Sequence, residues 1–274
     1  MELEVVIPVI VPPLQSQTSM STLRIIVILA TCFSGLGCSS NNLEVIAHMN
    51  LETTGPVSMY VDSFEGDVCI QQSDDHVGTS VEVLGRFADS SEISQGSSWL
   101  QCSATVHTNN LGQEVVVELV KTDDRIGRKQ IRITIISSDI HGVRVQTTRG
   151  DVDVQGVSGS MDIRTSDGDV RVATRLPMTD SVSIDNHRGN IMYRVRPESS
   201  GLIDATALGG ESVLYVPFGG SLILPNTTRE HLMASINGGD NPIVLRTVDG
   251  DIRIAVTENP MRGQPWYING WFPF

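Results

Sequence analysis

The sequence has little positive charge, few aromatic residues and few cysteines. It holds 19 Lys or Arg against 32 Asp or Glu, and the net charge of −13 disfavours nucleic acid and anionic membrane surfaces as partners. Aromatic residues are 5% of the chain, so Val, Ile and Leu must build most of the core. The 4 Cys form no CxxC pair, which excludes a disulfide-dense scaffold and an ordinary zinc ribbon. Hydrophobic residues reach 40%, which argues against a disordered chain.

The sequence also lacks the signatures of common enzyme classes. It has no GxSxG nucleophile elbow, no P-loop and no GxGxxG leading into a helix. Its 6 His are widely spaced, without HExxH or a pair at helical spacing, so we expect them on the surface or in turns. We therefore predict a protein that is not an enzyme and needs no cofactor, apart from the calcium ion considered below.

One apolar run stands near the start of the chain, at residues 25–37, and is too short to span a bilayer unaided. It follows Arg24 and ends in small residues, which is typical of a secretory signal peptide. Cys38 comes directly after it, and this order resembles a bacterial lipoprotein signal, which implies that Cys38 is lipidated and becomes the mature N-terminus. Leu36 departs from the usual lipoprotein pattern, so a plain signal or anchor is the alternative.

The chain therefore divides into an N-terminal targeting segment and a folded domain. Met20 is the expected start, because the acidic and proline-containing residues before it suit no signal peptide. The predicted parts are residues 1–37 as extension and signal, 38–50 as lipidated N-terminus and tether, 51–256 as the folded domain and 257–274 as an aromatic tail. We expect the tail either to cap the domain or to dock on a partner or membrane.

The predicted folded domain consists of repeats of one sequence template. The template is apolar-x-apolar, four residues, Gly, an acidic residue or Asn, then apolar-x-apolar. The anchor residues are Gly66, Gly150, Gly168, Gly189, Gly210, Arg229 in a degenerate copy, and Gly250. Successive anchors are separated by 84, 18, 21, 21, 19 and 21 residues, and the first separation equals four steps of 21.

Period-2 alternation in each unit indicates strands, and a unit this small cannot bury its own apolar face. We therefore predict an all-β fold, a right-handed parallel β-solenoid (β-helix) with coils of about 20 residues. Equivalent aliphatic residues would then stack in columns, with Val152 beside Val170. An antiparallel β-sandwich is the alternative, because Asp-Gly turns also make hairpins. Residues 75–138 depart from the template and are expected to be inserted hairpins or coils with elaborate corners.

Five units carry the resemblance to a known group. They read GDVCI, GDVDV, GDVRV, GNIMY and GDIRI. Over residues 55–256 the chain resembles the bacterial "putative adhesin" β-solenoid family, whose members are mostly of unknown function. The resemblance implies the fold and supplies no catalytic residue.

The residue after each anchor is acidic or Asn, and stacking would align these side chains in an outward column. The members are Asp67, Asp151, Asp169, Asn190, Glu211, Glu230 and Asp251. We expect their oxygens to cap turn amides. The alternatives are a Ca²⁺-binding column, because hard cations prefer oxygen ligands, and a carbohydrate- or partner-binding face.

Two other sets of residues have possible roles in chemistry or covalent linkage. A disulfide between Cys69 and Cys102 is one expectation, because an exported chain meets an oxidising setting. The alternative function is a Ca²⁺-dependent polysaccharide-active enzyme on a β-helix, with a periodic charged cluster formed by Asp169, Arg171, Asp185 and Arg188.

The predicted function is that of a non-catalytic, lipid-anchored cell-envelope protein, an adhesin-like binding or structural module. Its expected partners are the membrane, through the anchor, and an envelope polysaccharide or protein. The expected location is the bacterial outer membrane or cell surface.

Overall fold

The structure is a computed structural model that describes residues 43–85, 100–110, 112–121, 130–216, 221–223 and 227–262. Every regular element within these residues is a β-strand. Among them no helix is long and apolar enough to cross a membrane. The predicted signal segment, Cys38 and the aromatic residues of the tail from 263 onward lie outside the described residues.

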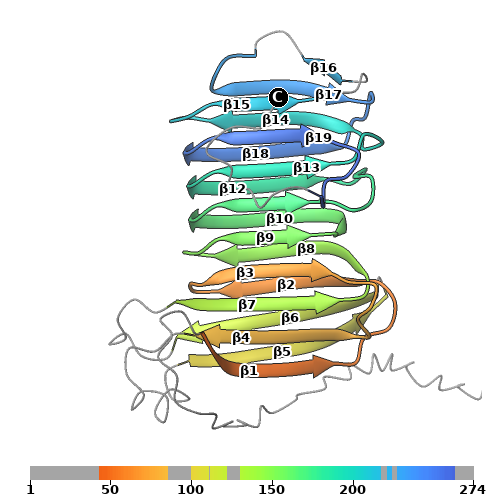
Figure 1. The fold of residues 1–274 in the computed structure, drawn as a ribbon, viewed down its shortest axis with the longest axis vertical. Coiled ribbons are helices and arrows are strands. Elements are labelled where there is room, and N and C mark those ends of the chain that lie inside the picture. Colours follow the sequence, from red (N-terminus) through yellow and green to blue (C-terminus); the bar gives the residue numbers. More distant parts are fainter. Residues whose placement is uncertain are drawn as a thin grey trace, which may run out of the picture.

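The strands form two mixed sheets that stand face to face (Figure 1). Within the described residues, the strands of sheet A follow the order β1 (Glu44–Leu51), β4 (Thr79–Gly85), β7 (Ile131–Ser137), β3 (Asp67–Gln72), β9 (Val152–Gln155), β11 (Val170–Ala173), β13 (Ile191–Val195), β19 (Ile252–Val256) and β15 (Ser212–Tyr215). Those of sheet B follow the order β16 (Ser221–Ile223), β17 (His231–Ile236), β14 (Gly201–Ala207), β18 (Pro242–Asp249), β12 (Val182–Arg188), β10 (Ser158–Asp167), β8 (Ile140–Thr147), β2 (Val57–Ser63), β6 (Gly112–Lys121) and β5 (Leu100–Asn109).

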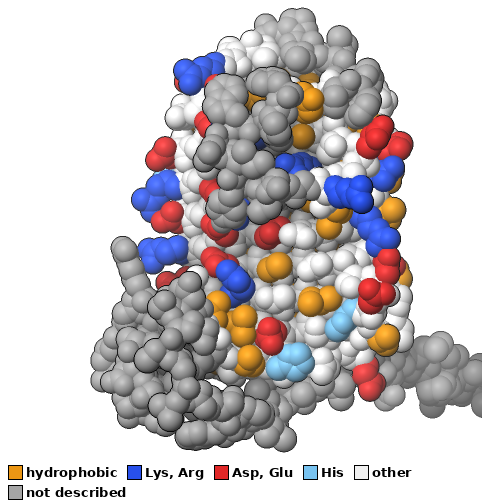
Figure 2. All heavy atoms as spheres, in the orientation of Figure 1, with side chains coloured by type: hydrophobic (Ala, Val, Ile, Leu, Met, Phe, Trp, Pro, Cys, Tyr) orange, Lys and Arg blue, Asp and Glu red, His pale blue; other side chains and the backbone are white. Residues whose placement is uncertain are grey.

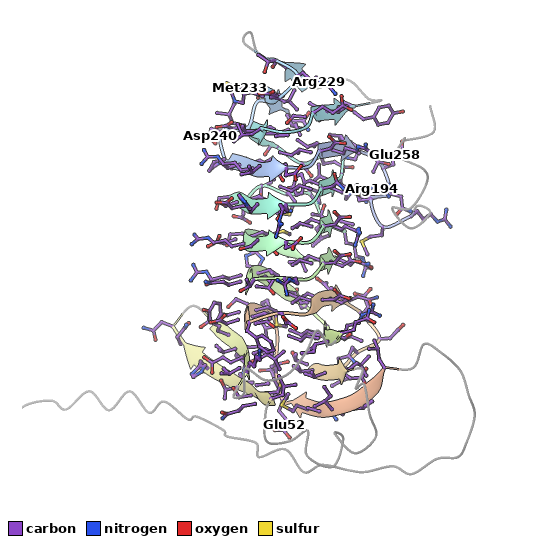
Figure 3. All side chains as sticks on the ribbon, turned by 90° about the vertical axis from the view of Figure 1, so that its left-hand side faces the viewer. Glu52, Arg194, Arg229, Met233, Asp240 and Glu258 are labelled. Atoms are coloured by element: carbon purple, nitrogen blue, oxygen red, sulfur yellow. The ribbon has the colours of Figure 1, made fainter. Side chains whose placement is uncertain are left out.

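The centre of the molecule is a solenoid-like stack. From β8 to β13 the chain alternates between the sheets, and each strand pairs in parallel with the equivalent strand of the next unit. Figure 3 shows the stack from the side, with Asp240 and Met233 on one flank and Arg194 and Glu258 on the other. The predicted parallel stacking is confirmed here, whereas the described strands show the antiparallel pairing of the rival prediction toward the two ends.

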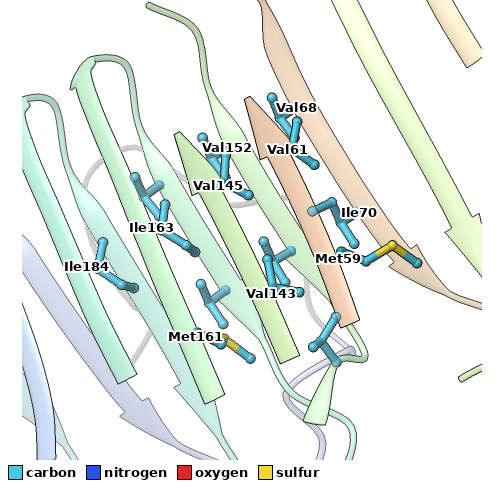
Figure 4. Packing of buried hydrophobic residues seen from close by; sticks show 14 of the residues in the cluster. Met59, Val61, Val68, Ile70, Val143, Val145, Val152, Met161, Ile163 and Ile184 are labelled. Atoms are coloured by element: carbon cyan, nitrogen blue, oxygen red, sulfur yellow. The ribbon is translucent and has the colours of Figure 1, made fainter. Parts of the chain in front are cut away.

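Aliphatic side chains fill the space between the sheets in columns that run along the stack (Figure 4). Val152 pairs with Val170 in register, as predicted, and both side chains are fully buried. The column extends through Ile191 and Ile252 to Ser212. Burying this continuous Val and Ile surface is what stabilises units that could not fold singly.

The order of the last units differs from the sequence order. β19 lies between β13 and β15, so the unit that is last in the sequence fills a place inside the stack. The degenerate copy around Arg229 does not form a parallel unit, because β17 pairs antiparallel with β14.

A ladder of glycines runs along the stack at the turns of the parallel units. Gly168 has φ 139°, and a Cβ there would lie 2.2 Å from the carbonyl oxygen of Gly150. The same close approach recurs at each step of the ladder, which runs Gly66, Gly150, Gly168, Gly189, Gly250 and Gly210. Arg229 is the residue that would extend this ladder, and its side chain cannot be accommodated at such a distance.

The region 75–138 contains both of the expected arrangements. Strands β6 and β7 form a unit that stacks in parallel on β2 and β3. Strands β4 and β5 pair antiparallel with β7 and β6. The separation of 84 residues between Gly66 and Gly150 is therefore an insertion and not four hidden units, because these two glycines are direct neighbours.

Candidate functional site

The predicted acidic column exists, and its oxygens cap backbone amides of the neighbouring unit. Asp169 shows the pattern, because its Oδ1 accepts from the N–H of Asn190 at 2.9 Å while its own N–H donates to Asp151 at 2.9 Å. Three further steps of 3.0 to 3.2 Å complete the ladder, with Asp67 accepting from the amide of Asp151, Asn190 from Asp251, and Asp251 from Glu211. The capping role is thus realised between neighbouring units.

The second oxygen of each carboxylate faces an arginine. Arg171 bridges two rungs, with Nη1 3.0 Å from Asp151 Oδ2 and Nη2 2.9 Å from Asp169 Oδ2. Its side chain is only 9% exposed, so these two pairs are well shielded from water. Arg253 pairs with Asp251 at 3.2 Å in the same manner. Alternating charge removes the repulsion that stacked carboxylates would otherwise suffer.

One predicted member stands apart from the column. Glu230 is exposed, and it is its backbone oxygen that accepts hydrogen bonds, from the Ser212 hydroxyl and the Ala207 amide. This follows from the antiparallel pairing of β17, which takes residue 230 out of the parallel register.

These contacts favour the capping role of the column over the cation-binding role. In the part of the chain that the structure describes, no three His, Cys, Asp or Glu side chains are grouped so that they could hold a metal ion. The carboxylates of Asp151 and Asp169 each use one oxygen for an amide and the other for Arg171.

The cluster proposed for a polysaccharide-active enzyme is not assembled. Asp169 and Arg171 lie with sheet A, whereas Asp185 projects from β12 in sheet B. Arg188 pairs with Asp167 Oδ2 at 3.0 Å and not with Asp169 or Asp185. The four residues share a period but not a face, because the chain changes sheet at each glycine turn.

A second charged column was missed by the sequence reasoning. It is formed by the residues that precede the anchors, which in stack order are Glu65, Arg149, Asp167, Arg188 and Asp249. Arg149 contacts Glu65 at 3.6 Å and Asp167 at 3.9 Å. Aligning the repeats would have revealed it, since the sign alternates from unit to unit. On the face drawn in Figure 2, acidic and basic side chains are likewise interspersed along the margins of the stack.

The predicted disulfide is absent. Cys69 and Cys102 are free thiols, on β3 of sheet A and β5 of sheet B respectively. The outward position of Cys69, set by strand alternation, keeps it away from the opposite sheet.

Both thiols should react slowly in the folded protein. Burial raises the pKa of Cys69 and of Cys102 from the ordinary 9.0 to about 11. The nearby Asp153 contributes to the shift at Cys69. Because the thiolate is the nucleophile, we expect alkylation at pH 8 to be roughly a hundredfold slower than in the unfolded chain. Peptide-resolved mass spectrometry after iodoacetamide treatment, with and without urea, measures this, and equal rates would contradict it.

A groove crosses the carboxyl ends of β2, β6, β8, β10 and β12 on the outer side of sheet B, with a volume of about 650 Å³. Its floor is a row of residues each four positions before an anchor, among them Asp62, Gln146, Arg164 and Asp185. The anchor residues alone do not indicate this row, because it lies four positions before them.

Comparison with known proteins gives a family and a fold. The model of the family described as Toastrack DUF4097 matches residues 88–255. A crystal structure described as a putative cell adhesion protein from Clostridium sporogenes is similar at a TM-score of 0.54 and 10% identity, over 79% of this chain and 100% of that one. A putative adhesin from Bacteroides fragilis matches at a TM-score of 0.29 and 14% identity, over 80% and 98% of the two chains. No curated protein matches the chain.

Proposed function

This chain belongs to the Toastrack DUF4097 family, and from its two outward faces we propose that it is a non-catalytic, adhesin-like binding module of the bacterial cell envelope. The observation that carries the proposal is the parallel register of the central units. It sets outward polar side chains in rows, one residue per strand, and so presents a rigid and repetitive surface. Such a surface suits an extended, repetitive partner.

The likeness to the cell adhesion protein of Clostridium sporogenes supports the fold of this proposal, since it spans that whole chain. We also propose that the stack is a right-handed β-solenoid. The right-handed sense is supported by a general rule, because connections between parallel strands of one sheet are right-handed in nearly all proteins.

The proposal includes a lipid anchor at Cys38, on the strength of the apolar run and the small residues before it. Two or more acyl chains would hold the domain stably at a membrane. Labelling of growing cells with an alkyne fatty acid should mark the full chain, and Cys38→Ser should abolish the label. A labelled Cys38→Ser chain would refute the anchor and leave the binding proposal standing.

Binding is tested with the full chain and isolated envelopes of the producing bacterium. We expect saturable retention of fluorescently labelled protein, lost when the protein is heat-unfolded beforehand. The same mixture should release no new reducing ends from the envelope glycans, with or without added Ca²⁺. Absence of saturable retention would overturn the binding module, and Ca²⁺-dependent release of reducing ends would replace it with the polysaccharide-active enzyme.

A further inference from the structure

We infer that the groove on sheet B is a binding site for an extended, uncharged polysaccharide chain. The inference deepens the proposed binding function and rests on it. It assigns the partner class and the face that recognises it.

The length of the groove fits a chain and not a single sugar. Its floor is one row of side chains in strict register, in the order Glu118, Asp62, Gln146, Arg164 and Asp185. Neighbouring strands lie about 4.8 Å apart, so the four steps of the row span roughly 19 Å. A partner that repeats along its length can make the same contact at several strands.

Three of the five side chains of the row are available to a ligand. Asp62, Gln146 and Asp185 are exposed and make no side-chain hydrogen bond or ion pair within the described part of the chain. They contrast with the acidic column, whose carboxylates are already occupied by amides and arginines. Carboxylates and amides that converge in a groove are suitable partners for sugar hydroxyls, which both donate and accept hydrogen bonds.

The rim of the groove adds hydroxyl groups and an apolar surface. Thr148 lies directly beyond β8 and Ser166 lies near the carboxyl end of β10, and both line the groove as exposed residues. Phe64 lines it too, half-buried, with part of its ring packed against the core. An aromatic ring fixed in this way offers the C–H face of a sugar a flat apolar contact.

The charge of the groove favours an uncharged partner. Its three carboxylates, Asp62, Glu118 and Asp185, outnumber the two cations, Lys121 and Arg164. Arg164 is in addition held by Asp162, with its Nε 3.2 Å from Oδ1 and its Nη2 3.3 Å from Oδ2. The chain as a whole carries −13, so a polyanionic glycan would be repelled over a long range.

The test is affinity electrophoresis of the full chain in native gels that contain dextran, laminarin, yeast mannan or alginate. We expect at least one of the three uncharged polysaccharides to retard the protein, and alginate not to. The variant Gln146→Ala/Asp185→Ala should weaken this retardation at least tenfold. The control Arg144→Ala/Ser183→Ala changes the same two strands and the same face two residues earlier, outside the groove, and should leave retardation unchanged.

Several outcomes would overturn the inference. They are no retardation by any uncharged polysaccharide, stronger retardation by alginate, or equal weakening in the two double variants. Should the groove variant melt early, Thr148→Ala/Ser166→Ala replaces it, because both residues are exposed and line the groove. Envelope binding that survives the groove variant, or that is destroyed by protease and not by periodate, would reject the groove and keep the binding module. Failure of the unmodified chain to bind envelopes would reject the binding module itself.

Discussion

Gly168→Ala should be among the most destabilising single substitutions in the protein. The methyl group would lie 2.2 Å from the carbonyl oxygen of Gly150, and the backbone at φ 139° is one that alanine avoids. Backbone strain of about 1–3 kcal/mol adds to overpacking of about 1–3 kcal/mol, so the free energy of unfolding should fall by roughly 4 kcal/mol. Thermal denaturation followed by circular dichroism should then show a Tm lowered by roughly 10 °C.

Gly55→Ala is the matched control for this effect. Gly55 also has a positive φ, of 76°, but a Cβ there meets no atom within 4 Å. Only the left-handed backbone opposes the change, at a cost of about 1 kcal/mol. A Gly168→Ala protein that melts no lower than Gly55→Ala would show that the units do not approach so closely.

Asp169→Ala should produce the second large loss of stability. It removes the acceptor of the Asn190 amide, and it takes one of the two carboxylates from the nearly buried Arg171. An unsatisfied amide together with a weakened buried ion pair should lower the free energy of unfolding by about 2–3 kcal/mol. Asp169→Asn should cost only about 1 kcal/mol, because it keeps the acceptor as Asn190 does in the natural column.

The control for the charge effect is Asp162→Ala. Asp162 also pairs with an arginine, Arg164, but that side chain is 65% exposed and the pair caps no amide. Exposed ion pairs contribute about 0.2–1 kcal/mol, so urea denaturation should place this variant close to the unmodified protein. If Asp162→Ala and Asp169→Ala lose the same stability, the column is an ordinary solvated surface.

The sequence was most informative where local chemistry and stacking impose the same period. The alternation of apolar residues predicts which side chains point inward, and the glycine spacing predicts which of them are neighbours in adjacent units. The pairing of Val152 with Val170 follows from these two patterns. The capping role of Asp169 followed from the same spacing, although its actual acceptor geometry reaches into the next unit.

What could not be predicted depends on contacts between distant segments. Spacing alone does not say which unit stacks on which, and so the place of β19 between β13 and β15 was not foreseen. The separation of 84 residues equals four periods by coincidence, because stacking does not constrain the length of an insertion. The groove is formed by side chains at the ends of five strands. The sequence of a single repeat does not indicate that the surface beside these side chains is concave.

The place of β18 and β19 has a consequence for how the molecule is made. As the chain is synthesised from its N-terminus, each unit as far as β13 can stack on a unit that has already been synthesised. Strands β14 and β15 emerge next, yet their parallel neighbours are residues 242–256, which come last. The layer formed by β18 and β19 is therefore completed only after the strands on both sides of it have been synthesised.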